Sequence, residues 1–292
     1  MTDEPSLQAM IDEPSLVAMI EQRLEGGNVE LPVFDDIALR VHTEVRDDKL
    51  DIANLCKILE EDPSLVADLL RMANSSFFSG LNPVNNLHEA AVRLGLKQIA
   101  ALVLSVSQKK MYSASKGCFH ERLTTLWLHS SSASMGARWL ARTAGYSNLA
   151  EEAYVAGLLH DVGKLSLLSI MEDIILKDHL TLSDDLIDMT LQQLHCEHGA
   201  QLIQHWNLPD SFREIVSSQC DDDFNLSNVE LCIVRVVDKA CLLEGVSDIP
   251  LTESNNVNLE TLPETRALGL SEIDLAELRL VLEDFKDTKK AA

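Results

Sequence analysis

Apolar side chains recur at helical spacing along most of this chain. From residue 31 onward, successive segments place them at positions i, i+3 and i+4, the pattern of an amphipathic helix. No segment shows the strict alternation of a half-buried strand. The fold should therefore be all-α, a multi-helix bundle. The predicted helices cover residues 36–45, 52–59, 64–74, 88–94, 98–111, 120–144, 149–160, 186–206, 209–220, 229–244 and 271–285.

The chain begins with a tandem nonapeptide. Residues 3–11 (DEPSLQAMI) are repeated at 12–20 as DEPSLVAMI. The acidic residue and proline at the start favour a helix over about residues 14–24. Two copies are too few for a solenoid, which needs about three. We interpret the repeat as a local duplication that extends a peripheral helix.

Breaks in the helical pattern suggest four parts. Residues 1–27 form an N-terminal helical extension, and residues 28–113 an N-terminal helical subdomain. The small residues at 113–117 mark the candidate boundary before a second helical subdomain at 118–245. Residues 246–292 contain a polar stretch, expected to be an exposed loop over 247–265, and a final helix whose Ser-x-x-Asp start is a capping signal.

Composition narrows the range of functions. The formal net charge is −23, so the surface should repel nucleic acid phosphates and anionic membranes. No segment resembles a signal peptide, and no apolar run approaches the roughly 20 residues that span a bilayer. The six cysteines include no C-x-x-C pair, and Cys232 and Cys241 lie in an apolar helix as expected core residues. We expect a cytoplasmic protein that binds neither membranes nor nucleic acid generically.

The sequence Gly-Leu-Leu-His-Asp-Val-Gly-Lys at 157–164 carries the most chemical information. An apolar helix ends at His160 and Asp161, and imidazole and carboxylate are both ligands of first-row metals. Neither side chain is stable in an apolar setting without a ligand or hydrogen bonds. Gly163 is expected to end the helix with a positive φ. A single His-Asp dipeptide proves little, so other ligands must lie elsewhere.

Three residues on other predicted helices are candidates. His129 lies in the long helix, Asp238 lies beside the apolar face of the 229–244 helix, and His198 follows His195 by about one turn. Each has a simpler interpretation. A lone histidine is more often a core or surface residue than a ligand, and Asp238 could pair with Arg235 or cap a neighbouring helix.

Taken together, the order His…His-Asp…Asp resembles the HD superfamily of metal-dependent phosphohydrolases. Residues 61–78 (EDPSLVADLLRMANSSFF) and 90–105 (AAVRLGLKQIAALVLS) narrow this resemblance to the HDOD family, a bacterial signal-transduction branch. Residues 198–209 (HGAQLIQHWNLP) also fit. The resemblance covers about residues 28–245 and implies an HD-type helical bundle with an N-terminal helical subdomain.

The resemblance implies functions for particular residues. His129, His160, Asp161 and Asp238 match the four ligands of a mononuclear HD site, which suits iron, manganese, nickel or magnesium. His198 matches a histidine of the related HD-GYP phosphodiesterases and is the best candidate for an additional catalytic group. Those enzymes need a later His-His pair, where this chain has Ser-Ser-Gln-Cys at 217–220. A complete second site of that kind, and cyclic-di-GMP hydrolysis, are therefore not expected.

Two functions remain open. The chain could be a metal-dependent phosphohydrolase that acts on a nucleotide or phosphate ester, with Asp161, Lys164 and His198 as its catalytic residues. Lys164 would then bind a substrate phosphate, although it could equally be a surface lysine. Alternatively, the chain is a signalling module that binds a metal and acts mainly on a protein partner. We favour the second function, because the second-metal histidines are missing.

Overall fold

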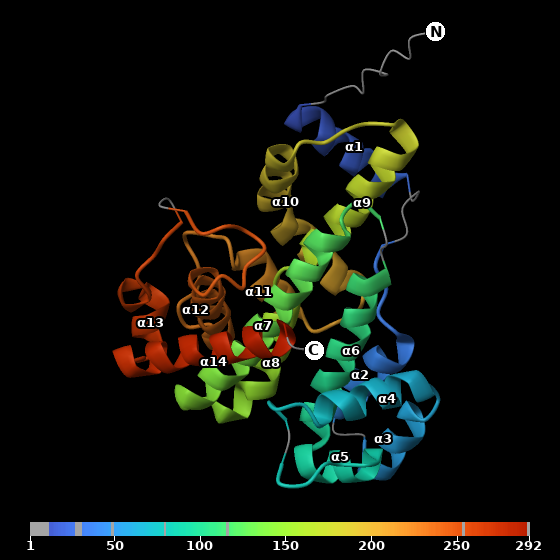
Figure 1. The fold of residues 1–292 in the computed structure, drawn as a ribbon, viewed down its shortest axis with the longest axis vertical. Coiled ribbons are helices and arrows are strands. Elements are labelled where there is room, and N and C mark those ends of the chain that lie inside the picture. The colour runs from blue at the N-terminus through green and yellow to red at the C-terminus, as the bar shows by residue number, and fades with distance from the viewer. Residues whose placement is uncertain are drawn as a thin grey trace.

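The computed structural model describes residues 12–26, 31–47, 50–78, 80–114, 117–252 and 255–290. The described residues form an all-α fold without extended strands, as predicted (Figure 1). The first copy of the nonapeptide repeat lies outside these ranges. The second copy forms most of α1 (Glu13–Glu25), and its Leu16 and Ile20 are fully buried. Because α1 packs on α9 and α10, the repeat contributes to the core at one end of the molecule.

The predicted N-terminal subdomain consists of short helices that begin at polar caps. These are α2 (Asp36–Arg46), α3 (Ile52–Leu59), α4 (Pro63–Ala73) and α5 (Leu87–Leu94), followed by the longer α6 (Leu96–Ala114). The Asp62 carboxylate caps α4 by accepting from the backbone N–H groups of Ser64 and Leu65, and Pro63 occupies the first turn, where its missing N–H costs nothing. The Asp-Pro-Ser-Leu motif is thus a helix start.

Asn74, at the other end of this motif, secures the following loop. Its side-chain amide donates to the carbonyl of Val84 at 2.8 Å, and its side-chain oxygen accepts from the Val84 N–H at 2.8 Å. This pair of bonds imitates a backbone ladder and satisfies a polar side chain that ends a buried helix. The most distinctive sequence of the subdomain therefore has a structural function.

The predicted second subdomain is built around α7 (His120–Thr143) and α8 (Ala150–Leu159). Around this pair lie α9 (Val162–Asp178), α10 (Asp184–His205), α11 (Asp210–Ser218) and α12 (Val229–Leu243). Helix α6 contacts α2 and α4 on one side and α7 and α8 on the other. One apolar core therefore extends through both subdomains, and Cys232 and Cys241 are buried in a smaller cluster against α7, as predicted.

The C-terminal helix α14 (Glu272–Lys290) lies across α7 and α12 (Figure 1). Ser271 caps it by accepting from the Asp274 N–H, while the Asp274 carboxylate accepts from the Ser271 N–H. Leu278 and Leu282 of α14 are fully buried. The predicted capping box and helix are confirmed.

Two local predictions were wrong. The stretch expected to be an exposed loop contains a 3-10 turn at Leu259–Thr261 and α13 (Pro263–Ala267), and Leu259 and Glu264 are buried. Gly163 does not end a helix. It lies in the first turn of α9, a helix that was not predicted, and its φ is not positive.

No single described helix is long and apolar enough to cross a bilayer. Helices α5 and α6 have the length and hydropathy of a membrane span only when they are taken together, and this pair is bent by 119°.

Candidate metal centre

Three helices and one helix junction carry the four predicted ligands. His129 lies in the middle of α7, His160 caps the end of α8, Asp161 separates α8 from α9, and Asp238 lies on α12. Helices α7 and α8 approach very closely at Gly157, where a Cβ atom would lie 2.7 Å from the carbonyl oxygen of Ala133. This approach brings His129 alongside His160.

The four side chains converge on one point. The two Nε2 atoms of His129 and His160 lie 3.0 Å apart. The His129 Nε2 atom lies 3.2 Å from Asp161 Oδ2 and 3.4 Å from Asp238 Oδ1, and the His160 Nε2 atom lies 3.5 Å and 3.9 Å from the same two oxygens. The structure thus brings together all four residues that the sequence order and the family resemblance selected.

Backbone contacts indicate which imidazole nitrogen carries the proton. His129 Nδ1 lies 3.1 Å from the carbonyl oxygen of Val246, and His160 Nδ1 lies 2.8 Å from that of Gly157. A carbonyl oxygen only accepts, so each Nδ1 is the donor and each Nε2 carries a lone pair. Two lone pairs and two carboxylate oxygens then face one another in a buried site. Such an arrangement requires a cation, and this donor set fits a divalent metal.

The pKa values agree with a site built for positive charge. Burial disfavours charged His129, but hydrogen bonds and charges from Asp161 and Cys241 prevail and hold its pKa well above the usual value. Burial also opposes ionisation of Asp161, yet the positive charge of Lys164 holds the pKa of this carboxyl well below its ordinary range. Without a metal, a proton on His129 would occupy the place of the cation.

Lys164 is buried rather than at the surface. Its Nζ donates to Asp161 Oδ2 at 2.6 Å and to Asp248 Oδ1 at 3.0 Å. Asp248, which the sequence did not single out, lies just beyond α12 in the polar stretch. The interpretation of Lys164 as a snorkelling surface lysine was wrong, because its ammonium group is bound by two carboxylates of the same chain.

Another histidine of α10 reaches the centre. His195 Nε2 lies 3.4 Å from Asp161 Oδ1. The charges that act on His198 are those of Glu197 and of Glu21 in α1, so His198 lies toward α1 and not at the centre. Gly163 explains the position of His195, because a Cβ there would lie 1.9 Å from the His195 carbonyl oxygen. Only glycine lets α9 and α10 approach so closely.

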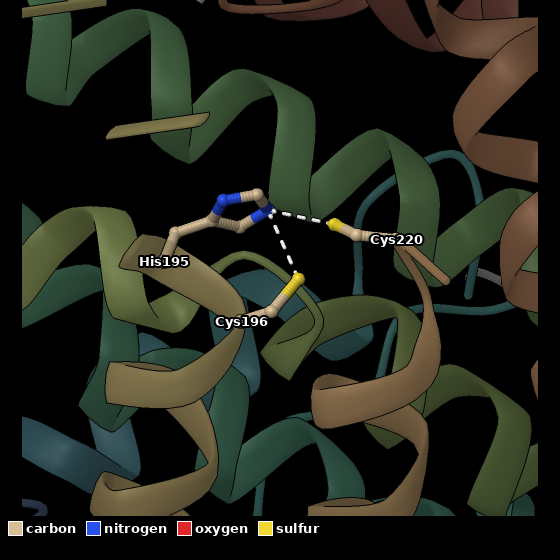
Figure 2. Close-up of side chains that lie close together, drawn as sticks. All are labelled: His195, Cys196 and Cys220. Atoms are coloured by element: carbon tan, nitrogen blue, oxygen red, sulfur yellow. Dashed lines mark hydrogen bonds between the residues drawn. The ribbon is translucent and has the colours of Figure 1, made fainter. Parts of the chain in front are cut away.

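Two cysteines lie beside His195 (Figure 2). Its Nε2 atom is 3.5 Å from Cys196 Sγ and 3.4 Å from Cys220 Sγ. The hydrogen bond from Cys196 outweighs burial and lowers the pKa of the Cys220 thiol to about 5. The same contact, followed by burial, raises the pKa of Cys196. Sequence spacing gave no sign of this cluster, because Cys220 belongs to another element.

Asp238 does not pair with Arg235, so that simpler interpretation of Asp238 is wrong. The Arg235 Nε atom lies 2.6 Å from Glu264 Oε1, and its guanidinium group lies over the ring of Phe224 at 3.7 Å. Asp238 faces the two histidines and has a longer contact, at 3.5 Å, with Lys239. It is the most exposed of the four converging residues, with 31% of its side chain accessible.

Fold and site together define a helical protein in which two histidines and two aspartates from α7, α12 and the junction of α8 with α9 converge on one point. The sequence profile described as the HDOD domain matches residues 31–221, well over half of the chain. The chain belongs to the HDOD family.

Solved structures share the fold. An HDOD domain protein of unknown function from Geobacter sulfurreducens is 24% identical, with a TM-score of 0.71 and 96% coverage of both chains. A protein from Shewanella amazonensis SB2B, named "Putative metal-dependent phosphohydrolase", is 18% identical with a TM-score of 0.73, over 94% of this chain and 98% of that one. A "Putative signal transduction protein" from Marinobacter aquaeolei VT8 is 21% identical with a TM-score of 0.67, over 96% of this chain and 64% of the other.

One curated relative matches part of the sequence. An uncharacterized protein of Treponema pallidum (strain Nichols) is 24% identical over 187 residues. The match covers 62% of this chain and 36% of that protein, so this chain corresponds to about a third of the relative's length.

Proposed function

We propose that this protein is a signalling module that binds one divalent metal ion at His129, His160, Asp161 and Asp238 and acts mainly by binding a protein partner. The burial of the centre carries this proposal. His129 and His160 expose at most 1% of their side chains, and Asp161 exposes 4%. A metal held there stabilises the junction of α7, α8 and α12 but leaves little space for a substrate.

The neighbours of Asp161 support the same function. Its Oδ2 atom is bound by Lys164, and its Oδ1 atom faces His195. Because Lys164 is held by Asp161 and Asp248, its charge serves the fold rather than a substrate phosphate. We infer that Lys164 positions Asp161 as a ligand and neutralises part of the negative charge.

The surface suits a protein partner better than a nucleic acid. The net charge of −23 opposes association with phosphate backbones. On the N-terminal subdomain, Leu81 is fully exposed and Val92 of α5 is 63% exposed. Arg93 donates to the carbonyl of Asn82, so the loop that carries Leu81 lies beside α5. We infer that the partner is a protein and that it contacts this subdomain.

The alternative function is hydrolysis of a nucleotide or phosphate ester. One observation favours it, because the partial exposure of Asp238 leaves one edge of the centre close to solvent. When bound there, a divalent metal would supply Lewis acid chemistry to a phosphoryl group. In that case we propose His195, in place of His198, as the histidine near the reacting atoms.

Metal content and hydrolysis, measured on the same variants, test these proposals. We expect the purified full chain to hold a divalent metal that Asp161→Asn and His129→Gln remove, while Asp222→Asn in the exposed acidic loop retains it. We also expect no metal-dependent turnover of nucleotides or phosphodiesters. Turnover that disappears in Asp161→Asn but persists in Asp222→Asn would establish the hydrolase instead. A chain that binds no metal at these residues would refute both proposals.

A further inference from the structure

A second group of metal-ligating side chains lies beside the His₂Asp₂ centre. His195 and Cys196 are consecutive residues of α10, and Cys220 lies two residues beyond the end of α11. Their imidazole nitrogen and two sulfur atoms all lie within 4.8 Å of one another. Figure 2 shows the two thiols on the same side of the ring, both directed toward Nε2.

We propose that His195, Cys196 and Cys220 form a second metal site that binds a thiophilic divalent cation of the zinc class. Sulfur and imidazole nitrogen are the preferred ligands of zinc, and a set of three leaves one position of a tetrahedron open. Asp161 Oδ1 lies 3.4 Å from His195 Nε2 and is the nearest carboxylate oxygen to complete the set. Binding would release protons from the thiols to solvent.

The imidazole is already oriented for this function. His195 Nδ1 lies 2.8 Å from the carbonyl oxygen of Leu191, so Nδ1 is the donor and the Nε2 lone pair faces the two thiols. Metal-binding histidines commonly use a carbonyl oxygen in this way to fix the tautomer. The close contact at Gly163 also fixes the backbone of His195 against α9. The ligand is therefore held in place from two sides.

The segment that carries Cys220 is held just as firmly. Arg235 Nη1 donates to the carbonyl oxygens of Gln219 and, at 2.9 Å, of Asp221. The side chain of Gln219 donates to the carbonyl of His160, which ties this segment to the end of α8. Polar contacts on both sides of Cys220 thus fix its backbone, as expected for a preorganised ligand.

The location of the cluster would let an ion enter directly from solvent. His195 is buried, Cys196 is partly buried and Cys220 is exposed. The outer side of the cluster therefore faces water. The two sites share only Asp161, whose Oδ2 atom faces His129 and whose Oδ1 atom faces His195. The sulfur ligands belong to the second site alone, so its occupancy does not depend on the proposed function.

Cobalt substitution in the reduced full-length protein tests this proposal. Cobalt bound by thiolate gives a charge-transfer band that cobalt bound only by nitrogen and oxygen does not give. We expect the wild type to show this band and zinc to displace it. Cys196→Ser and Cys220→Ser should lower the zinc affinity by more than about 100-fold, since loss of an outer-shell partner alone costs about 10- to 100-fold. The double variant should lose the band.

Two controls separate this site from its neighbours. Cys118→Ser removes an exposed thiol outside the cluster and should keep the band. His129→Gln should weaken metal binding at the His₂Asp₂ centre and also keep the band. Loss of metal from that centre can therefore be distinguished from loss of metal from the cysteine site. In the wild type, zinc should protect two thiols from alkylation, a readout that needs no variant.

Three results would overturn the proposal. The first is a wild type without a thiolate band. The second is a band that persists in the Cys196→Ser, Cys220→Ser double variant, which would place the ion on another thiol. The third is formation of a Cys196–Cys220 disulfide in the presence of excess zinc and reductant, because the pair would then be a redox couple.

Discussion

Substitution of Gly163 by alanine would test how the crossing of α9 and α10 positions His195 beside Asp161. A Cβ atom at this position would lie 1.9 Å from the carbonyl oxygen of His195 and 2.7 Å from the backbone nitrogen of Gly199. Both neighbours are backbone atoms of α10, so neither can move away by changing a side-chain rotamer. The two helices themselves must separate.

The magnitude follows from these distances. Ordinary contact begins near 3.4 Å, so the helices must part by about 1.5 Å at this point. Overpacking of this kind costs about 1–3 kcal/mol, and we expect the upper end because the contact is backbone to backbone. Alanine also has a higher helix propensity than glycine, which offsets about 1 kcal/mol. The net loss in the free energy of unfolding should be about 2 kcal/mol.

Denaturation by urea, monitored by circular dichroism, measures this loss. The matched control is Gly80→Ala, because its Cβ would come no closer than 3.4 Å to Arg93, and it should stay within about 0.5 kcal/mol of the wild type. The separation should also move His195 away from Asp161 and weaken metal binding at the proposed site of His195, Cys196 and Cys220. If Gly163→Ala proved as stable as the wild type, or more stable as helix propensity alone predicts, the close crossing would be refuted.

Three further predictions concern buried charge. Lys164→Met removes the ammonium group that lies between the carboxylates of Asp161 and Asp248 and should cost about 3–5 kcal/mol in chelator, less with divalent metal present. An equal loss in both conditions would contradict this prediction. Burial and the charge of a nearby arginine lower the pKa of His42 to about 4, so it stays neutral in the folded protein while the unfolded chain takes up a proton below about pH 6.5. The stabilisation from neutral His42 is complete above about pH 6.5 and is lost as the pH falls toward 4, by about 3 kcal/mol. His42→Phe should therefore reduce the change in the free energy of urea unfolding over this pH range by that amount. An unchanged pH dependence would count against the lowered pKa of His42. Arg235→Lys keeps the charge but loses the planar contact with Phe224 and the forked hydrogen bonds to backbone carbonyls. We therefore expect thermal denaturation to show a loss of about 2 kcal/mol in the free energy of unfolding. Unchanged stability would mean that only the charge of Arg235 matters.

The sequence was most informative about local structure. Helix starts were readable because a cap and the first turn lie within four residues of each other, as at Asp62 with Pro63 and at Ser271 with Asp274. The all-α class followed from apolar spacing that any window of the chain reveals. The family resemblance, which the profile match confirms, came from a motif that ends at Asn74 and whose function is local as well.

Glycine shows where local inference failed. A glycine after an apolar helix favours a stop, and Gly163 was interpreted in this way, so α9 was missed. The residue is needed because another helix passes close to it, and the sequence of α9 alone contains no trace of that helix. The same limitation made the stretch around Glu264 look like an exposed loop, although Arg235 draws this residue into a buried ion pair.

The sequence by itself determined the all-α class and most of the helices, although not α9 or α13, and the order of His129, His160, Asp161 and Asp238 selected four side chains that converge in the fold. Only the tertiary structure decided that His195, and not His198, faces Asp161. The two histidines are less than a turn apart on α10, and the rotation of that helix depends on its close contact with Gly163. Only the tertiary structure, too, placed Cys220 beside Cys196, since proximity between separate helices depends on how their surfaces pack.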